Sequence, residues 1–132
     1  WILIHQRLDS TVWSPFGWSS YRNGFGSIST AYYWFGLEPI YQLVSAKQYM
    51  LKIEVQLTNG LYFVDQYSTF NLKDEAGKYA LHTSGWTGTN TDIFDYSLLG
   101  CRPDGQKFST YDNDNDGLLV NCASQNGGGW WF

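Results

Sequence analysis

The stretch YMLKIEVQLTNGLYFVDQYSTF, residues 49–70, decides the fold of this chain. Its first eight residues alternate between apolar and mostly polar side chains, with the apolar set at Tyr49, Leu51, Ile53 and Val55. A period of two residues is typical of a strand with one buried face. Asn59-Gly60 then supplies the residue pair that a two-residue hairpin turn prefers. We therefore expect residues 48–57 and 61–70 to pair as antiparallel strands.

More elements are expected on both sides of this hairpin. Downstream, residues 70–72 and 79–81 flank the turn sequence Asp74-Glu75-Ala76-Gly77, which predicts a second hairpin. Upstream, apolar residues at helical spacing predict a short helix that contains Leu37, Ile40, Tyr41 and Val44.

The N-terminal part predicts one strand and one further helix. The apolar run at residues 1–6 favours a buried strand. Ser14 is a candidate N-cap with Pro15 in the first helical turn, and Gly24 and Gly26 are candidate terminators. The fold class expected from the whole pattern is α+β, with a central antiparallel sheet, short flanking helices and an irregular, loop-rich part after Ser84.

Composition excludes several kinds of partner. The net charge is −4 with only eight Lys and Arg residues, so the basic surface of a nucleic-acid-binding protein is missing. No apolar run reaches membrane-spanning length, so no membrane insertion is expected. Aromatic residues make up 19% of the chain, which fits a core rich in rings or an aromatic binding face. The chain begins at Trp1 and ends on an aromatic run at Phe132, and we expect it to be a fragment of a longer domain.

The motif most suggestive of chemistry is Asp112-Asn113-Asp114-Asn115-Asp116-Gly117. Three carboxylates on alternate residues repel one another unless a cation lies between them, and a hard cation such as Ca²⁺ prefers oxygen ligands. The spacing matches the first half of an EF-hand loop, but the twelfth position is Ala123, where that loop needs a Glu. The motif therefore predicts a calcium site that is not an EF-hand.

Catalytic constellations are not apparent. His5 and His82 are isolated in the sequence, and Glu38, Glu54 and Glu75 lie on separate predicted elements, so no pair of carboxylates is arranged for glycoside hydrolysis. Cys101 and Cys122 lack the spacing of zinc or redox motifs. We do not expect an enzyme.

Several motifs in order along the chain resemble the fibrinogen-related family, which includes fibrinogen chains, ficolins, tachylectins, angiopoietins and tenascins. The opening resembles the family's Trp-x-x-x-x-Gln-Arg-Arg, with Leu8 in the last position. The other matching stretches are Trp18-x-x-Tyr21-Arg22-x-Gly24-Phe25-Gly26, Tyr33-Trp34-Phe35-Gly36-Leu37-Glu38-x-Ile40, Phe108-Ser109-Thr110-x-Asp112-x-Asp114-Asn115-Asp116, Asn121-Cys122-Ala123 and Gly129-Trp130-Trp131. The resemblance implies a single partial domain over residues 1–132, with a central subdomain over about 1–95 and the start of a calcium- and ligand-binding subdomain over about 96–132.

The resemblance also implies roles for individual residues. Calcium would be held by the side chains of Asp114 and Asp116 and by the backbone carbonyls of Leu118 and Val120. Asp112 would lie behind these ligands and support them.

Cysteine and ligand-binding roles follow in the same way. Cys122 matches a family cysteine that forms a disulfide with a cysteine further downstream. Cys101 has no counterpart in most members, and it could be a free thiol, pair with another chain or pair with Cys122. Gln125 and Asn126 match a Gln-Asp pair that lines the peptide-binding hole of the fibrinogen γ chain, and Asn126 lacks the acid's charge.

The function expected from the resemblance is that of a secreted, non-enzymatic recognition domain. The first expectation is calcium-stabilised, lectin-like binding of carbohydrate or acetylated groups in innate immunity. The alternative is a protein–protein interaction module of the extracellular matrix or of growth-factor signalling. In either case the full-length protein is expected to be oligomeric.

Overall fold

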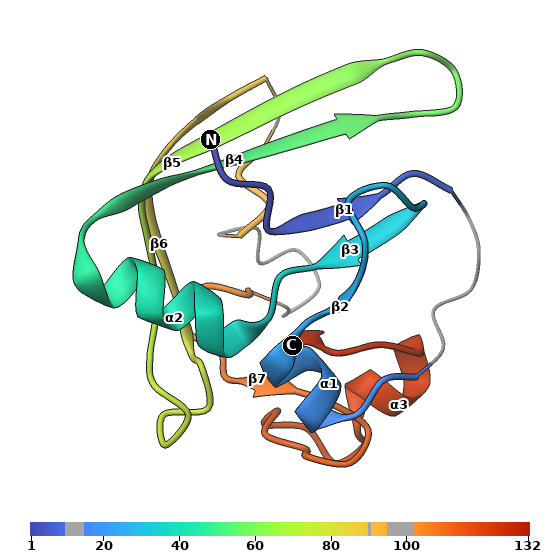
Figure 1. The fold of residues 1–132 in the computed structure, drawn as a ribbon, viewed down its shortest axis with the longest axis vertical. Helices are drawn as coiled ribbons and strands as arrows, with labels where there is room; N and C mark the ends of the chain where they lie inside the picture. The colour runs from blue at the N-terminus through green and yellow to red at the C-terminus, as the bar shows by residue number, and fades with distance from the viewer. Residues whose placement is uncertain (10–14, 90, 95–101) are drawn as a thin grey trace.

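The computed structural model describes residues 1–9, 15–89, 91–94 and 102–132. Within these ranges the chain forms three short helices and three antiparallel sheets, as Figure 1 shows. The α+β class with a central antiparallel sheet is therefore confirmed.

The central sheet has the strand order β4-β5-β6. It consists of β4 (Tyr49–Gln56), β5 (Tyr62–Leu72) and β6 (Leu81–Gly88). The predicted first hairpin is confirmed, since Gln56 pairs with Tyr62 across the turn that contains Gly60. The second hairpin is confirmed as well, because Leu72 pairs with Leu81.

A smaller sheet has the order β1-β3-β2, with β1 at His5–Arg7, β2 at Phe25–Gly26 and β3 at Tyr32–Trp34. The prediction of a buried strand over residues 1–6 is wrong. The strand begins only at His5, and Trp1 is 82% exposed. The apolar run favoured burial, but residues 1–3 are exposed and only from Ile4 onward does the segment pack against the core. A Lys52 ammonium lies over the Trp1 ring.

Two helices precede the central sheet. The second, α2 (Leu37–Ala46), agrees with its predicted spacing, and Leu37, Ile40 and Val44 are buried. The first, α1 (Trp18–Asn23), ends before Gly24 as expected, but it begins later than predicted. Pro15 lies outside the helix, and Ser14 lies outside the described residues. The helix begins at Trp18 because its backbone N–H is capped by the distant carboxylate of Asp112.

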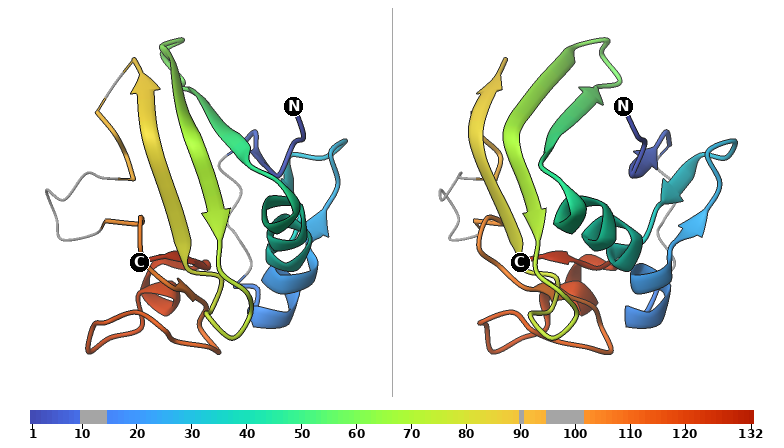
Figure 2. Two further views of the ribbon diagram at one scale, coloured as in Figure 1. Left: turned by 90° about the vertical axis from the view of Figure 1, so that its left-hand side faces the viewer. Right: turned by 60° about the vertical axis from the view of Figure 1, so that its left-hand side comes forward.

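The C-terminal part contains β7 (Phe108–Ser109), α3 (Cys122–Asn126) and β8 (Trp130–Trp131). Strands β7 and β8 pair, so the end of the chain returns to the strand that precedes the acidic loop. Both views in Figure 2 place this part below the central sheet, with α2 beside the sheet.

An aromatic core joins these parts. Phe108, from β7, is fully buried, and its ring contacts the rings of Tyr21, Trp34 and Trp131. Helix α1, the small sheet and the paired strands β7 and β8 therefore share one core. This shared core fixes the acidic loop relative to the N-terminal half.

Candidate functional site

The acidic loop leaves β7 and is anchored to it by Asn115. The Asn115 backbone N–H donates to the Ser109 hydroxyl at 2.8 Å, and its side-chain amide donates to the Phe108 carbonyl at 2.8 Å. Thr110 and Asn113 also exchange two backbone hydrogen bonds. One of the asparagines between the carboxylates therefore has a structural role that the sequence alone did not indicate.

The Asp112 side chain points towards the start of α1. Its Oδ1 accepts the Trp18 backbone N–H at 2.9 Å and the Thr110 hydroxyl at 2.7 Å. Burial raises the pKa of Asp112, but the hydrogen bonds from Thr110 and Trp18 outweigh it, so the pKa lies below its ordinary value. This position fits the predicted supporting role behind the metal ligands.

Asp116, the last carboxylate of the acidic motif, accepts hydrogen bonds from both ends of the segment at residues 118–122. Its Oδ1 accepts the Leu118 N–H at 2.9 Å, and its Oδ2 accepts the Cys122 N–H at 2.9 Å. Burial raises the pKa of Asp116, and these backbone hydrogen bonds lower it to below its ordinary value. Asp114 is linked to the same turn, because its Oδ1 accepts the Asp116 N–H at 3.2 Å.

The fit of a calcium ion can be judged from this donor set. Within the described residues, no three His, Cys, Asp or Glu side chains gather as a metal-holding group. The predicted set has only two such side chains, Asp114 and Asp116, and relies on the carbonyls of Leu118 and Val120. No hydrogen bond to either carbonyl occurs within the described parts of the chain, and each carboxylate oxygen has a second lone pair. The residues present therefore fit an oxygen-ligated cation.

Helix α3 begins at Cys122, directly after residues 118–121. The Asn121 side chain caps it by accepting the Ser124 N–H at 2.8 Å, and its amide donates to the carbonyls of Thr110 and Tyr111, both at 3.2 Å. Cys122 is buried, and its predicted disulfide stays a prediction. Cys101 lies outside the described residues.

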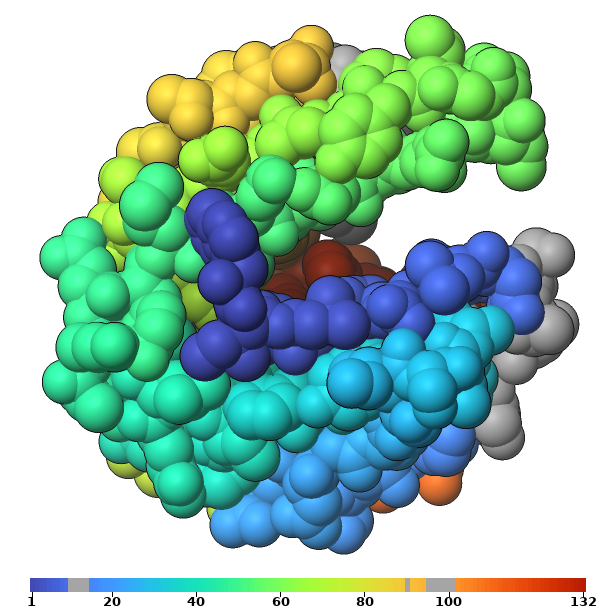
Figure 3. All heavy atoms as spheres, turned by 45° about the horizontal axis from the view of Figure 1, so that its top comes forward, coloured from blue at the N-terminus to red at the C-terminus, as the bar shows by residue number. Residues whose placement is uncertain are grey.

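A cavity of about 320 Å³ lies on the other side of α3. Of the two predicted ligand-binding residues, Asn126 lines this cavity and Gln125 does not, although Gln125 is exposed on the same helix. Figure 3 shows a hollow between β1 and the β4–β5 hairpin, with the C-terminal residues at its floor, but no residue of β4 or β5 lines the cavity itself. The cavity is lined by His5, Arg7, Tyr21, Trp34, Asn126, Gly127, Gly128, Gly129, Trp130 and Phe132.

Gly129 allows the chain to pass from α3 into β8 across the core. A Cβ atom there would lie 2.8 Å from the Phe108 ring and 2.9 Å from the Tyr21 ring. The Gly129 N–H also donates to the Tyr21 hydroxyl at 2.9 Å. The Gly-Trp-Trp sequence therefore meets a steric need for Gly and places Trp131 in the core.

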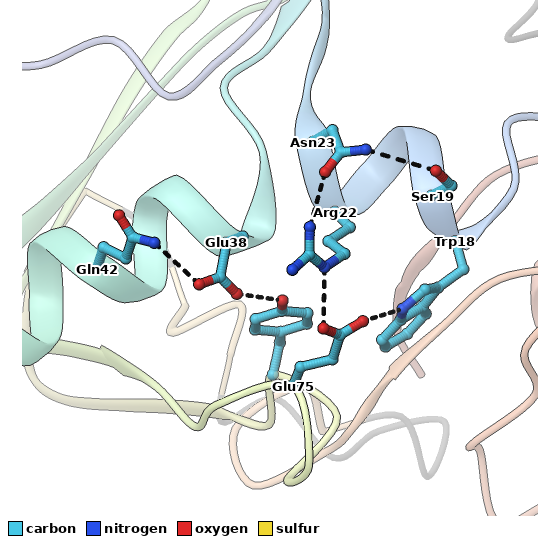
Figure 4. A network of polar contacts seen from close by, with 8 residues as sticks. Trp18, Ser19, Arg22, Asn23, Glu38, Gln42 and Glu75 are labelled. Atoms are coloured by element: carbon cyan, nitrogen blue, oxygen red, sulfur yellow. Dashed lines mark hydrogen bonds and ion pairs between the residues drawn. The ribbon is translucent and has the colours of Figure 1, made fainter.

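A polar network positions α1, which in turn carries the cap contact to the acidic loop (Figure 4). Glu75 accepts the Trp18 indole N–H at 3.0 Å and the Arg22 guanidinium N–H at 2.9 Å. Tyr79 donates to Glu38 at 2.6 Å. The hydrogen bonds from Tyr79 and Gln42 lower the pKa of Glu38, and those from Trp18 and Arg22 lower that of Glu75.

Sequence reasoning placed Glu38 and Glu75 on separate elements and missed this network. A tertiary contact brings them to one region, since the turn between β5 and β6 folds against both helices. Each carboxylate is already engaged by neighbouring donors, so the pair serves to hold the helices and the turn together.

Asp116 of the acidic loop is hydrogen-bonded to Cys122, the first residue of α3, and the last residue of α3, Asn126, lines the cavity. The chain belongs to the family of fibrinogen beta and gamma chains, C-terminal globular domain, whose model matches residues 1–132. The resemblance seen in the sequence is thereby confirmed.

Curated relatives support this assignment over the whole chain. Fibrinogen-like protein A of Apostichopus parvimensis is 34% identical over 135 residues, which cover 100% of this chain and 45% of that protein. Human angiopoietin-1 is 38% identical, and the match covers 100% of this chain and 25% of that protein. The human fibrinogen gamma chain is 37% identical, with 100% and 32% covered.

Solved structures agree. The fibrinogen-like globe domain of human ANGPTL2 superposes with a TM-score of 0.86 at 34% identity, covering 98% of this chain and 56% of that one. Lamprey fibrin D-dimer, complexed with the peptide Gly-His-Arg-Pro-amide, gives a TM-score of 0.85 at 31% identity and covers 97% and 43%. The chain thus spans a quarter to just over half of the length of these relatives.

The fibrinogen and angiopoietin relatives are secreted, non-enzymatic proteins, and membership in their family supports an extracellular binding module. Among the described residues, no helix has the length and apolar character needed to cross a membrane. The boundary predicted between two subdomains near residue 95 stays a prediction.

Proposed function

We propose that this chain is a calcium-stabilised recognition domain that acts outside the cell and binds carbohydrate or acetylated groups with residues 111–132. One observation carries the proposal. Asp116 of the acidic loop holds the N–H of Cys122, the first residue of α3, and α3 presents Asn126 to the cavity. A cation in the loop would therefore order the wall of the cavity without touching the ligand.

The chemistry of the cavity suits a small polar ligand with an apolar face. Four of its lining side chains are aromatic, and rings supply flat apolar contact area for a sugar or an acetyl methyl group. His5, Arg7 and Asn126 add polar groups that can orient hydroxyl or amide groups of the ligand.

Calcium would be held by the carboxylates of Asp114 and Asp116 and by the carbonyls of Leu118 and Val120. Asp112 would support this set through its contacts with Thr110 and α1. When bound, the ion supplies positive charge that offsets the repulsion between neighbouring carboxylates. With the ion bound, the Asp116 carboxylate would keep its hydrogen bond to Cys122 and so hold the start of α3 in place.

Isothermal titration calorimetry tests the calcium proposal. The unaltered chain should bind Ca²⁺, and the double variant Asp114→Ala with Asp116→Ala should give no binding heat. Glu54→Ala removes an acidic residue on β4, away from the loop, and should bind like the unaltered chain. Undiminished calcium affinity in the double variant would refute the assignment.

Binding to immobilised N-acetylglucosamine and glucose tests the carbohydrate proposal. The chain should prefer the acetylated sugar. EDTA should weaken binding, because loss of calcium would leave α3, which carries Asn126, less ordered. Asn126→Leu should weaken binding further, whereas Gln125→Leu, which changes a neighbour outside the cavity lining, should have a smaller effect. Equal retention of both sugars by all variants would contradict the proposal.

The second candidate function is binding of an extracellular protein or peptide. Its support is the lamprey fibrin D-dimer, which superposes well and is complexed with the peptide Gly-His-Arg-Pro-amide. In this chain Asn126 carries no charge for a peptide amine, so Asn126→Asp should strengthen binding of that peptide by about tenfold, or about 1.4 kcal/mol. Peptide binding without sugar binding would replace the first candidate by the second.

Under both candidate functions we expect the full-length protein to be oligomeric, because several domains in one assembly strengthen weak binding to repeated ligands. Light scattering on the full-length protein measures it directly.

A further inference from the structure

Three consecutive apolar side chains are exposed in the C-terminal region. Leu118 is 59% exposed, Leu119 106% and Val120 51%. Single exposed apolar residues are common on protein surfaces, but a contiguous apolar group is typical of an interaction site. We call Leu118, Leu119 and Val120 the apolar tip.

The apolar tip has a defined support. The Asp116 carboxylate accepts the N–H of Leu118 with one oxygen and the N–H of Cys122 with the other, both at 2.9 Å. One side chain thus holds both ends of the segment that carries the tip. Asn121, directly after the tip, donates to two backbone carbonyls of the neighbouring segment. An anchor that is held in place before binding loses little conformational entropy on binding.

The residues that precede and follow the tip in the sequence are mostly polar or acidic. Tyr111 is exposed, as are Ser124, Gln125 and Asn126 on the helix that follows. An apolar centre with a polar rim is the usual arrangement of a protein interface. In the sequence from Phe108 to Phe132, every charged side chain is an aspartate, at positions 112, 114 and 116.

We propose that the apolar tip is the anchor by which this domain docks onto an extracellular protein that offers an apolar pocket with Lys or Arg at its rim. The apolar side chains match the pocket, and the carboxylates of Asp114 and Asp116 at the base of the tip match a basic rim. The same aspartates disfavour an anionic membrane surface, because like charges repel. The inference rests on the recognition role proposed above and shares Asp116 and the backbone of Leu118 and Val120 with the proposed calcium ligands, but it does not involve the carbohydrate cavity.

A selection from random peptides displayed on phage tests the proposal. The probes are the peptides recovered on the immobilised chain, which are then synthesised and titrated against three proteins: the unaltered chain, Leu119→Asp and Leu8→Asp. Leu8 is 72% exposed and lies directly after β1, so Leu8→Asp makes the same chemical change on an exposed leucine elsewhere. Both variants should keep the melting temperature of the unaltered chain, since neither side chain is buried.

The expected peptides combine aliphatic or aromatic residues with Lys or Arg. Their affinity should fall by at least about tenfold on Leu119→Asp and stay unchanged on Leu8→Asp. Leu119→Ser should show most of the same loss, which separates lost apolar contact from added charge. Peptides that bind Leu119→Asp as tightly as the unaltered chain, or a selection without any peptide sensitive to position 119, would overturn the proposal.

Two further measurements keep the outcome specific. Co-sedimentation with phosphatidylcholine–phosphatidylserine vesicles should show no binding that depends on Leu119, and such binding would assign the tip to membranes instead. Repeating the peptide titration in EDTA separates the two proposals. Peptide binding that persists in EDTA would support the docking anchor, whatever calorimetry finds for the calcium site.

Discussion

Replacing Asp112 by Ala should loosen the link between the acidic loop and α1. Helix α1 has Gly17 at its N-cap and no side-chain cap of its own, and the Asp112 carboxylate accepts the Trp18 N–H in that role. Loss of an N-cap costs about 0.5–2 kcal/mol. Because the same oxygen also accepts the Thr110 hydroxyl, we expect a loss of about 1–2 kcal/mol in the free energy of unfolding. For a chain of this size that is a melting temperature lower by about 4–8 °C.

Thermal unfolding followed by near-ultraviolet circular dichroism measures the change. EDTA in the buffer removes any contribution from bound calcium. Asp112→Asn is the matched control, since its amide oxygen can still accept the Trp18 N–H, and it should lose less than Asp112→Ala. An Asp112→Ala chain that melts within experimental error of the unaltered chain would refute the capping argument.

The pH dependence of stability gives a second test of the hydrogen bonds that Asp112 accepts. The pKa of Asp112 is lower in the folded chain than its ordinary value of 3.8, because the hydrogen bonds outweigh the effect of burial. A group with a lowered pKa stabilises the fold above its unfolded pKa, and this contribution is lost as pH falls through the folded pKa. The stability difference between the unaltered chain and Asp112→Asn should therefore be full near neutral pH and shrink below about pH 4. A difference that is constant from pH 7 to acid would contradict this assignment.

Three other substitutions probe the core and the turns. Tyr79→Phe removes the hydrogen bond to Glu38 and should cost about 1.5–3 kcal/mol in urea unfolding; an NMR titration should show the pKa of Glu38 rising towards its ordinary value. Gly129→Ala should lower the free energy of unfolding by about 1–3 kcal/mol, because its methyl group meets two buried rings. Gly128→Ala is the control and should cost less, because the nearest atom to its added Cβ is a hydroxyl at 3.3 Å. Gly60→Ala should cost about 1 kcal/mol through its φ of +87° alone, since no atom lies within 4 Å of the added Cβ, and a melting curve that does not shift would rule out backbone strain at this turn.

Local patterns predicted the elements whose cause is local. The strand at residues 49–56, its hairpin partner and the helix at residues 37–46 were predicted correctly, because alternation, helical spacing and the Asn59-Gly60 turn act between near neighbours. The family was also recognisable from the sequence, since its motifs keep their order along the chain.

The candidate site was predicted in part. The spacing of the carboxylates drew attention to the acidic loop, and in the structure Asp112 caps α1 while Asp114 accepts the Asp116 N–H. The metal-binding roles of these residues stay predictions. The cavity beside Asn126 could not be predicted, because its lining comes from β1, α1, β3 and the end of the chain, which are far apart in sequence.

The sequence by itself determined the hairpins, α2 and the position of the acidic loop, because each depends on residues close to one another in the chain. It also determined the family, because the order of the family's motifs can be read along the chain. Tertiary structure alone decided where α1 begins and whether residues 1–4 are covered. The cap of α1 comes from a carboxylate 94 residues away, so no local signal at Ser14-Pro15 could reveal it. Burial of an apolar segment depends on whether another layer packs over it, and hydropathy cannot report that. The exposure of Leu119 has the same origin, since Asp116 and Asn121 hold its segment away from the core that its own side chain would favour.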